Sequence, residues 1–401
     1  MVFEDRESRV IFHPGVYNIR ECQGENIVQD CCYPVPNGVR GIVNCDGRQG
    51  GAMGKIPFEA VASRFTILSP QHNFTEETHT VEVRKDPLLG DASAYNPFLR
   101  DKAKAFFGDN DPDLVRRLVD ESSKTCIFCG DRIEKTTPKY PPAIVPEGRL
   151  RRGESVLFPN LFAIGKYHAV VALSASHFLK LSEFTTEIIG NGLTVARDFI
   201  KAVYRNDDSV QFATINANYL FPGGASLVHP HLQVLLTPLA YSYHARMIEA
   251  CRDYHNRNSS TFHVDLIEEE RNRGIRYVAH LGNWHWMTAF SPLGSNEVTA
   301  IHETASDFAQ LSDGDIRALA AGISKVLTFY ESLGYLSYNY SLYSVRQPQA
   351  GEGHRCILKI VNRQNLYTNY RNDDYFLQKM LQTELIITQP EELAGRLRTF
   401  Y

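Results

Sequence analysis

One order of predicted elements occurs twice along this chain, and this repeat restricts the possible folds more than any other feature. Apolar residues alternate in the strand segments and recur every three or four residues in the helical ones. The first copy comprises strands over 155–162 and 168–177, a helix over 181–203, and strands over 211–220 and 229–238. The second comprises strands over 285–292 and 298–303, a helix over 311–333, and strands over 337–345 and 354–363. Two copies of one strand–strand–helix–strand–strand unit predict an α+β fold built from tandem halves, each with an antiparallel sheet and a packed helix.

The two copies differ at one chemically informative position. Aligning them places Ile357 where the first copy has His231, so the second copy lacks this histidine. The alignment also matches His302 with His177, because each precedes the long helix of its copy. We therefore expect the first half to carry the chemistry and the second half to be degenerate.

Charge and hydropathy exclude several classes of protein. Lys and Arg number 42 and Asp and Glu 46, a formal charge of -4 at pH 7, which excludes a strongly basic nucleic-acid-binding chain. No apolar run approaches the roughly 18 residues of a spanning helix, and the first ten residues are too acidic for a signal peptide. We expect a soluble cytoplasmic protein without nucleic-acid or membrane partners, in which 1–75 form an extension, 76–240 the first half and 241–401 the second.

Polar and apolar residues alternate at the start of the last strand of the first copy. His229, His231 and Gln233 share one face of that strand, while Pro230 and Leu232 point the other way. A hydrogen-bonded polar face near the end of a sheet is the simple interpretation. A catalytic site is the alternative, because a neutral imidazole is a good nucleophile at neutral pH.

A glycine-bearing loop over 221–226 precedes these residues. The flexible backbone at Gly223 and Gly224 allows amide groups to approach a phosphate closely, and Ser226 adds a hydroxyl donor. A pair of glycines on its own is commonly just a turn. Directly before the histidines, the loop predicts a phosphate-binding element.

Cys126 and Cys129 have the C-x2-C spacing of a metal-binding pair. Eight cysteines in 401 residues are too few for a disulfide scaffold, so a reducing compartment and metal or redox roles are expected. With His177 and His229, the pair would form a closed tetrahedral Zn²⁺ site of two sulfurs and two nitrogens, which would be structural. Reduced core cysteines beside unrelated histidines are the alternative.

Taken together, these motifs resemble the galactose-1-phosphate uridylyltransferase branch of the histidine-triad superfamily. The resemblance extends from about Glu82 to the C-terminus and is carried by residues 83–88, Cys126, Cys129, His177, Asn218, Ser226, 229–233, 284–286, His302 and 390–398. It implies two histidine-triad-like halves, one structural Zn²⁺ per chain, and a nucleotidyltransferase that works by double displacement. Residues 1–75 match no part of the family that we identify.

The resemblance also implies roles for individual residues. His231 would attack the α-phosphorus of a nucleotide donor through Nε2, while a carbonyl near His229 holds the other ring nitrogen protonated. Gln233, where hydrolases of the superfamily have a third histidine, can donate a hydrogen bond to phosphate but cannot act as an acid or base, which favours transfer over hydrolysis. Ser226 would bind the α-phosphate, and Asn218 would position the phosphate or sugar of the nucleotide.

Two departures from the family pattern concern the second half and the substrate. Leu232 replaces the usual glycine before the glutamine, but it faces away from the histidines. The last core strand of the second half lacks the His-x-His that helps to build a second metal site, so one metal is expected although His285 and His302 remain. Lys359 on that strand indicates a different anionic substrate group.

The expected reaction transfers UMP or AMP between phosphate-bearing substrates, with a sugar 1-phosphate as the favoured acceptor and a homodimer as the assembly. The second half would shape the acceptor pocket or a dimer contact. Arg84 and Arg100 would add positive charge near the distal phosphate, with a solvated surface role as the alternative. Trp284 and Trp286 would stack a base or sugar or, more commonly, pack in the core. Rival functions are a phosphorylase or hydrolase of dinucleoside polyphosphates or adenylyl sulfate, and a non-catalytic nucleotide-binding protein.

Overall fold

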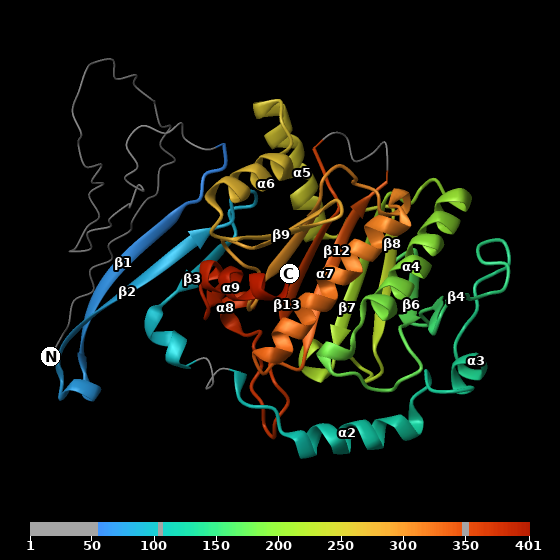
Figure 1. Cartoon of the computed structure of the whole chain (residues 1–401), viewed down its shortest axis with the longest axis horizontal. Coiled ribbons are helices and arrows are strands. Elements are labelled where there is room, and N and C mark those ends of the chain that lie inside the picture. Colours follow the sequence, from blue (N-terminus) through green and yellow to red (C-terminus); the bar gives the residue numbers. More distant parts are fainter. Residues whose placement is uncertain (1–54, 103–106, 347–352) are drawn as a thin grey trace, which may run out of the picture. The chain divides into compact units, whose positions relative to one another are not determined.

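The computed structural model describes residues 55–102, 107–346 and 353–401, all of which belong to one compact unit (Figure 1). The elements up to the middle of the chain are β1 (Ala60–Ser69), β2 (Thr75–Lys85), β3 (Ala92–Tyr95), α2 (Pro112–Thr125), α3 (Arg132–Thr136), β4 (Leu150–Arg152), β5 (Ser155–Pro159), β6 (Tyr167–Ala172), α4 (Thr186–Asn206), β7 (Phe212–Tyr219) and β8 (His231–Thr237). Those that follow are α5 (Ser242–Asn258), α6 (Phe262–Arg273), β9 (Tyr277–Leu281), β10 (Trp284–Thr288), β11 (Val298–His302), α7 (Asp313–Ser332), β12 (Tyr338–Val345), β13 (Ile357–Asn362), α8 (Phe376–Lys379), β14 (Thr383–Ile386) and α9 (Pro390–Leu397). None of the helices in these ranges has the length and apolar character needed to cross a membrane.

The larger of the two sheets is symmetric about its middle. Its strand order is β4-β5-β6-β8-β7-β12-β13-β11-β10-β9, so β5, β6, β7 and β8 correspond to β10, β11, β12 and β13. The helices α4 and α7 occupy equivalent places in the two copies. The predicted α+β fold and the predicted repeat are therefore present, and the two copies meet where β7 pairs with β12. A second sheet has the order β1-β2-β3-β14.

Strand pairing identifies the corresponding residues of the two halves. Ala172 of β6 lies opposite His231 of β8, and Ile301 of β11 lies opposite Ile357 of β13. Ile357 therefore occupies the place of His231, as the sequence alignment predicts. The second half has kept the strand and lost the imidazole.

The predicted match between His302 and His177 is wrong. The N–H of His302 donates to the carbonyl of Cys356, just as the N–H of Leu173 donates to the carbonyl of Pro230. Leu173 is thus the counterpart of His302. Both histidines stand before a helix, but His177 lies in the loop beyond the end of β6, where a sequence alignment has no strand register to guide it.

A straight row of side chains crosses the centre of the larger sheet. Gln233 pairs with Asn216, Asn216 with Ser341, and Ser341 with Lys359. Three strand spacings of about 4.8 Å put Lys359 about 14 Å from Gln233. Gln233 and Lys359 are equivalent residues of the two halves, so this distance separates the two equivalent places in the sheet.

The helices α4 and α7 cover one face of this sheet (Figure 1). The side chains of Thr185 and Ser312 accept hydrogen bonds from backbone N–H groups in the first turns of these helices, which fixes where each helix begins. Trp284 and Trp286 are fully buried in the core on this side. A Cβ at Gly322 of α7 would lie 1.9 Å from Trp286, so glycine is needed for this close approach. The core interpretation of both tryptophans is confirmed.

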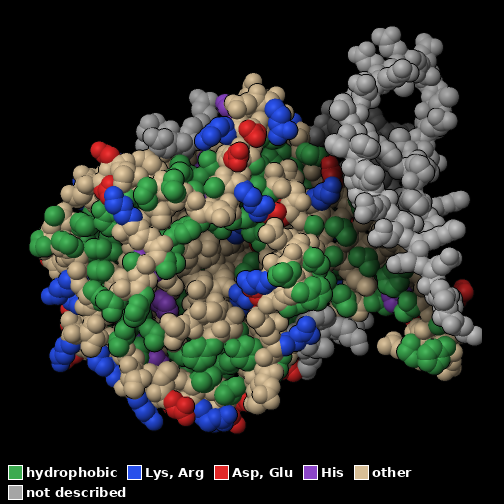
Figure 2. Space-filling model, turned by 180° about the vertical axis from the view of Figure 1, so that it is seen from behind, with side chains coloured by type: hydrophobic (Ala, Val, Ile, Leu, Met, Phe, Trp, Pro, Cys, Tyr) green, Lys and Arg blue, Asp and Glu red, His purple; other side chains and the backbone are tan. Residues whose placement is uncertain are grey.

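The opposite face is covered differently in the two halves. In the second half, α5 and α6 supply Met247, Cys251 and Ile267, which pack over Ile301 and Ile357. In the first half, Asn216, Asn218 and Gln233 on β7 and β8 are only partly buried, whereas His231 is buried. This face is hollowed near its middle, and histidine side chains show beside the hollow (Figure 2).

Candidate metal centre and active site

Cys126, Cys129, His177 and His229 lie together, although three separate segments supply them. The cysteines follow the end of α2, His177 lies beyond β6, and His229 precedes β8. One ligand atom from each residue lies within 4.8 Å of the others. The Sγ of Cys129 is 3.3 Å from His177 Nδ1 and 3.4 Å from His229 Nδ1, and the Sγ of Cys126 is 3.7 Å from His229 Nδ1. Tetrahedral Zn²⁺ would hold sulfur and nitrogen about 3.6 Å apart, so these residues fit a metal ion.

The tautomers of both histidines suit metal binding. His229 Nε2–H donates to the carbonyl of Ser174 over 2.8 Å, so its Nδ1 carries a lone pair. The hydroxyl of Ser122 donates to the carbonyl of Leu118, and its oxygen lies 2.8 Å from His177 Nε2, from which it accepts. Burial lowers the pKa of His229 to about 4, so the ring is neutral. Such outer partners orient metal ligands, and sequence reasoning missed both serines because their contacts join distant segments.

The backbone holds one ring nitrogen of His231, the first residue of β8. Its Nδ1–H donates to the carbonyl of His229 over 2.8 Å, as the sequence predicts, and this leaves the Nε2 lone pair available. Burial lowers the pKa of His231, which favours the neutral ring. Phe128 from the cysteine segment places its ring 5.7 Å from the rings of both histidines. His229, just before β8, and His231, its first residue, are thus separated by one residue and share a neighbour.

Gln233 is held by a residue that the sequence did not single out. The N–H of Ile164 approaches Nδ1 of His168 at 3.4 Å, so Nε2 of His168 carries the proton and donates to Oε1 of Gln233 over 2.9 Å. With its oxygen accepting, the amide of Gln233 presents its NH₂ as a donor. His168 points to the same face of the sheet because it is two residues from Val170, which pairs with Gln233.

Asparagines of the two halves meet beside His231. Asn218 follows Ala217, whose partner on β8 is Leu232, so Asn218 lies in the row of His231. Its Oδ1 accepts a hydrogen bond from Asn339 Nδ2 over 2.7 Å. Asn339 of β12 also donates to the carbonyl of Gly223 over 2.7 Å. The second half therefore contributes to the position of Asn218 and of the glycine-bearing loop.

The loop over 221–226 forms a tight turn. The N–H groups of Gly223 and Gly224 donate to the carbonyls of Leu220 and Phe221, so they are not free to bind a phosphate in this conformation. Gly224 has φ +82°, which favours glycine, and a Cβ at Gly223 would lie 3.0 Å from the carbonyl of Tyr338. The two glycines thus shape the turn, and Ser226, which is exposed, is the donor that the loop offers.

The three predicted cations do not gather around His231. Arg84 is buried and bonded to Glu82 and Glu391, its Nη1 lying 2.9 Å from Glu391 Oε1. Arg100 pairs with Glu392 over 2.8 Å. Each arginine is thus already neutralised by a carboxylate, and these contacts give no support to a role at a distal phosphate.

Lys359 also departs from its predicted role. Its Nζ lies 2.6 Å from Glu297 Oε1, and the row across the sheet places it about 14 Å from Gln233. Burial alone would lower the pKa of Lys359, but Glu297 and Asp86 raise it above its usual range, so the lysine keeps its charge. Lys359 therefore balances a buried carboxylate within the second half.

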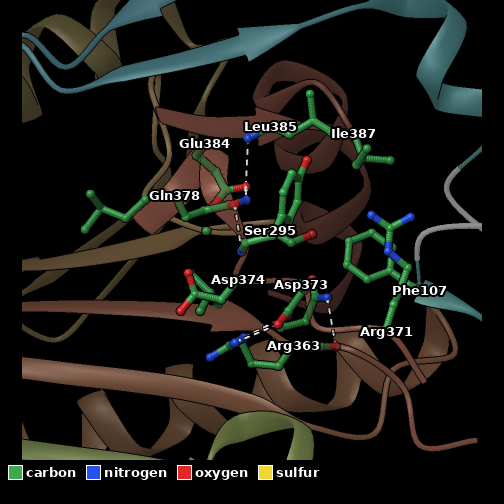
Figure 3. A pocket seen from close by; sticks show the side chains of 15 residues that line it. Phe107, Ser295, Arg363, Arg371, Asp373, Asp374, Gln378, Glu384, Leu385 and Ile387 are labelled. Carbon is green, nitrogen blue, oxygen red and sulfur yellow. Dashed lines mark hydrogen bonds and ion pairs between the residues drawn. The ribbon is translucent and has the colours of Figure 1, made fainter. Parts of the chain in front are cut away.

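A pocket of about 180 Å³ with both apolar and charged side chains on its walls lies at the end of β13 (Figure 3). Arg363 makes two parallel hydrogen bonds to Asp373 on its wall, and it also donates to Asn339, the partner of Asn218. Burial raises the pKa of Glu384 on the opposite wall to about 7. The Arg363–Asn339–Asn218 chain of hydrogen bonds connects this pocket with the row of His231.

No family model matches the chain. A protein of Archaeoglobus fulgidus, described as uncharacterised, is 30% identical over 327 residues, which cover 81% of this chain and 94% of that protein.

Three solved structures share the fold. A GalT-like protein of Arabidopsis thaliana has a TM-score of 0.60 at 17% identity, covering 79% of this chain and 98% of that one. An ADP-glucose phosphorylase of the same plant, solved with bound ADP-glucose, has a TM-score of 0.60 at 18% identity with the same coverage. A uridylyltransferase has a TM-score of 0.56 at 18% identity, covering 62% of this chain and 85% of that one. The chain belongs to the family of the archaeal protein, and its fold is that of the GalT-like protein, the ADP-glucose phosphorylase and the uridylyltransferase.

Proposed function

We propose that this protein is a nucleotidyltransferase that forms a covalent nucleotidyl-His231 intermediate. The observation that carries the proposal is the 2.8 Å hydrogen bond from His231 Nδ1 to the carbonyl of His229, because it directs the other nitrogen outward as a free nucleophile. The names of the structural neighbours, a uridylyltransferase and an ADP-glucose phosphorylase, agree with this chemistry.

The reaction consists of two in-line displacements at one phosphorus atom. In the first, the lone pair of His231 Nε2 forms a bond to the α-phosphorus of the donor, and the bond from that phosphorus to the bridging oxygen breaks. The leaving phosphate keeps the electron pair of the broken bond. In the second, a phosphate oxygen of the acceptor attacks the same phosphorus, and the phosphorus–nitrogen bond returns its electron pair to Nε2.

Gln233 distinguishes transfer from hydrolysis in this mechanism. Its NH₂ can donate to a non-bridging oxygen of the α-phosphate and stabilise the charge that develops there. It cannot deliver a proton to a leaving group or remove one from water. A phosphate leaving group needs no such proton, so Gln233 suits exchange between phosphates. Ser226 and Asn218 are proposed to position the α-phosphate and the nucleotide.

Zn²⁺ is the proposed occupant of the site formed by Cys126, Cys129, His177 and His229. The metal would supply structural stabilisation, since four protein ligands leave no open position. Its effect on catalysis would pass through His229, whose carbonyl holds His231. Metal analysis of the purified protein should find Zn²⁺, and Cys129→Ser should lower the content by one ion per chain; a wild-type protein without metal would contradict the assignment.

The second half is proposed to receive the acceptor, for which a sugar 1-phosphate is favoured. The pocket of Figure 3 is lined by carboxylate, amide and guanidinium groups, which suit sugar hydroxyls. A phosphorylase that uses orthophosphate as its acceptor is the second candidate, because one structural neighbour is named an ADP-glucose phosphorylase. The homodimer and the cytoplasmic location stay predictions.

Intact-protein mass spectrometry tests the proposed chemistry without knowledge of the acceptor. The protein is incubated with single donors, namely UDP-glucose, ADP-glucose, UTP, ATP, a dinucleoside tetraphosphate or adenylyl sulfate. We expect an acid-labile mass increase of one nucleoside monophosphate, which also names the base. His72→Gly, at an exposed site, is the matched control and should retain the adduct. Donor binding without any adduct would favour a nucleotide-binding protein and contradict the proposal.

A further inference from the structure

A second group of potential metal ligands lies at the edge of the larger sheet, in the half that lacks the nucleophile. His280 of β9 pairs directly with His285 of β10, and Glu303 follows the end of β11. One ligand atom from each of the three residues lies within 4.8 Å of the others. Because directly paired residues of adjacent strands point to the same face, the two imidazoles are held together by the sheet itself.

The rings of this group are oriented by the surrounding backbone. His280 and His285 stack with their centroids 4.2 Å apart and their planes within 5°, so the exposed ring of His280 must turn before both lone pairs can meet at one ion. The pairing of β9 with β10 shifts between Trp286 and Met287, and this irregularity pairs Tyr277 with Met287 on the face of His285. The hydroxyl of Tyr277 then lies 2.9 Å from His285 Nδ1. The other nitrogen, Nε2, is directed at Glu303 Oε1, 3.4 Å away.

This orientation repeats the arrangement at the first site. There, an oxygen of Ser122 or Ser174 holds one nitrogen of each histidine and leaves the other for the metal. Here, Tyr277 holds Nδ1 of His285 and leaves Nε2 facing a carboxylate. His285 is 1% exposed, so the sheet and Tyr277 fix its ring in place.

A histidine–carboxylate hydrogen bond is the metal-free alternative. Such a bond would be charge-assisted if the ring were protonated, and it would then measure about 2.7–2.9 Å. The distance of 3.4 Å between His285 Nε2 and Glu303 Oε1 is longer, and it leaves room for the two atoms to bind one ion from different sides. His280 has no place in this alternative.

We propose that His280, His285 and Glu303 bind a divalent transition metal ion such as Zn²⁺, Co²⁺ or Fe²⁺. Two imidazoles and one carboxylate select such ions over Mg²⁺ and Ca²⁺. Three protein ligands leave open positions, which face the cavity lined by Glu268 and Arg271 of α6. The site therefore differs in kind from the closed four-ligand site of the first half.

His302, the other histidine that the sequence leaves in this half, is not a ligand of the proposed site. Its Nδ1 accepts hydrogen bonds from the N–H groups of Thr304 and Ala305, and its Nε2 lies 3.5 Å from Asp315. The site also makes no use of β13, where Ile357 and Lys359 stand in the family's His-x-His positions. It is thus a separate arrangement on β9, β10 and β11.

Titration of the metal-free, untagged protein with Co²⁺ tests this proposal, because the two sites give different spectra. Co²⁺ bound by thiolates at the first site produces an intense sulfur-to-metal charge-transfer band, whereas nitrogen and oxygen ligands produce only weak visible bands. We expect two Co²⁺ per chain in the wild type. Cys129→Ser should abolish the charge-transfer band and retain the weak bands.

Glu303→Gln is the decisive variant, because the side chain is half exposed and its loss should not disturb folding. It should weaken binding of the second Co²⁺ by at least about tenfold and leave the charge-transfer band unchanged. Glu268→Gln, on the wall of the same cavity, is the matched control and should retain both ions. A wild type that binds only the thiolate-coordinated Co²⁺, or a Glu303→Gln variant that binds both ions as tightly as the wild type, would overturn the proposal.

Discussion

The two halves of the larger sheet share one backbone plan and use it for different purposes. At equivalent places, the first half has His231 and Gln233, and the second has Ile357 and Lys359. Gln233 is only partly buried, whereas Ile357 is covered by Met247 and Cys251 of α5 and Ile267 of α6. The same arrangement of strands can therefore carry a candidate site in one half and a packed core in the other. The difference lies in the side chains on one face of the sheet and in the helices that cover that face.

The way each half treats charge also differs. In the first half, hydrogen bonds with uncharged partners, the carbonyl of His229 and the ring of His168, orient His231 and Gln233. In the second half, Lys359 and Glu297 form a buried ion pair of 2.6 Å. A neutral imidazole with a free ring nitrogen can attack phosphorus. A lysine that forms an ion pair with a carboxylate is not available to bind an anionic substrate group.

The largest expected effect comes from removing the imidazole that only one half has. His231→Gly should lower nucleotidyl transfer by about 10⁴-fold or more, because the covalent step is lost. Ile357→Ala at the equivalent place should retain transfer and destabilise the fold by about 2–5 kcal/mol, since it empties a packed site. Transfer assays and chemical denaturation of both variants check this contrast. Equal loss of activity in the two would mean that the halves do not divide their roles in this way.

The buried pair of the second half gives the next largest effect, on stability. Lys359→Met leaves Glu297 charged and buried, which should cost about 3–5 kcal/mol in the free energy of unfolding. The double variant Lys359→Met with Glu297→Gln should recover most of this loss. Chemical denaturation measures both. A variant that keeps its stability and loses substrate affinity would instead restore the role that the sequence suggested for Lys359.

Gln233 should have a smaller effect, confined to the rate. Gln233→Ala removes a donor to the phosphate and should lower the rate of transfer by about 10²–10³-fold, with the metal content and melting temperature unchanged. His168→Ala, which only releases the amide oxygen of Gln233, should lower it less. Single-turnover rates of adduct formation separate the two. A larger loss in His168→Ala than in Gln233→Ala would contradict the assigned order of roles.

The smallest expected effect concerns the helices that cover the two halves. Gly322→Ala in α7 places a methyl group against Trp286 and should destabilise the protein by about 1–3 kcal/mol. Gly190→Ala in α4 is the matched control, because the nearest atom to its Cβ would be 3.7 Å away. That substitution should instead stabilise by about 0.5–1 kcal/mol. Thermal unfolding measures the change in melting temperature of each variant. Equal changes in the two variants would contradict the close packing of α7 on β10.

Features that depend on local spacing could be predicted from the sequence. The C-x2-C spacing with two histidines identified the cluster that the structure assembles. Strand alternation held for His231 and Gln233 on β8, but His229 lies before that strand begins. The repeat predicted the symmetric sheet.

Features that depend on distant partners could not be predicted. The charge of Arg84 is neutralised by Glu391, more than 300 residues away, and no local pattern reveals that pairing. His168 sits in an apolar strand segment, and only the strand register brings it to Gln233. Residues 1–54 lie outside the described residues, so the interpretation of that segment remains a prediction.

The central claim is that the nucleotide becomes attached to Nε2 of His231, and locating the adduct tests it most directly. The protein is labelled with the donor that gives the mass increase, digested under alkaline conditions that preserve a phosphorus–nitrogen bond, and mapped by tandem mass spectrometry. The account predicts one modified peptide, with the nucleoside monophosphate on His231 and none on the peptide that contains Ile357. An adduct on any other residue would contradict it.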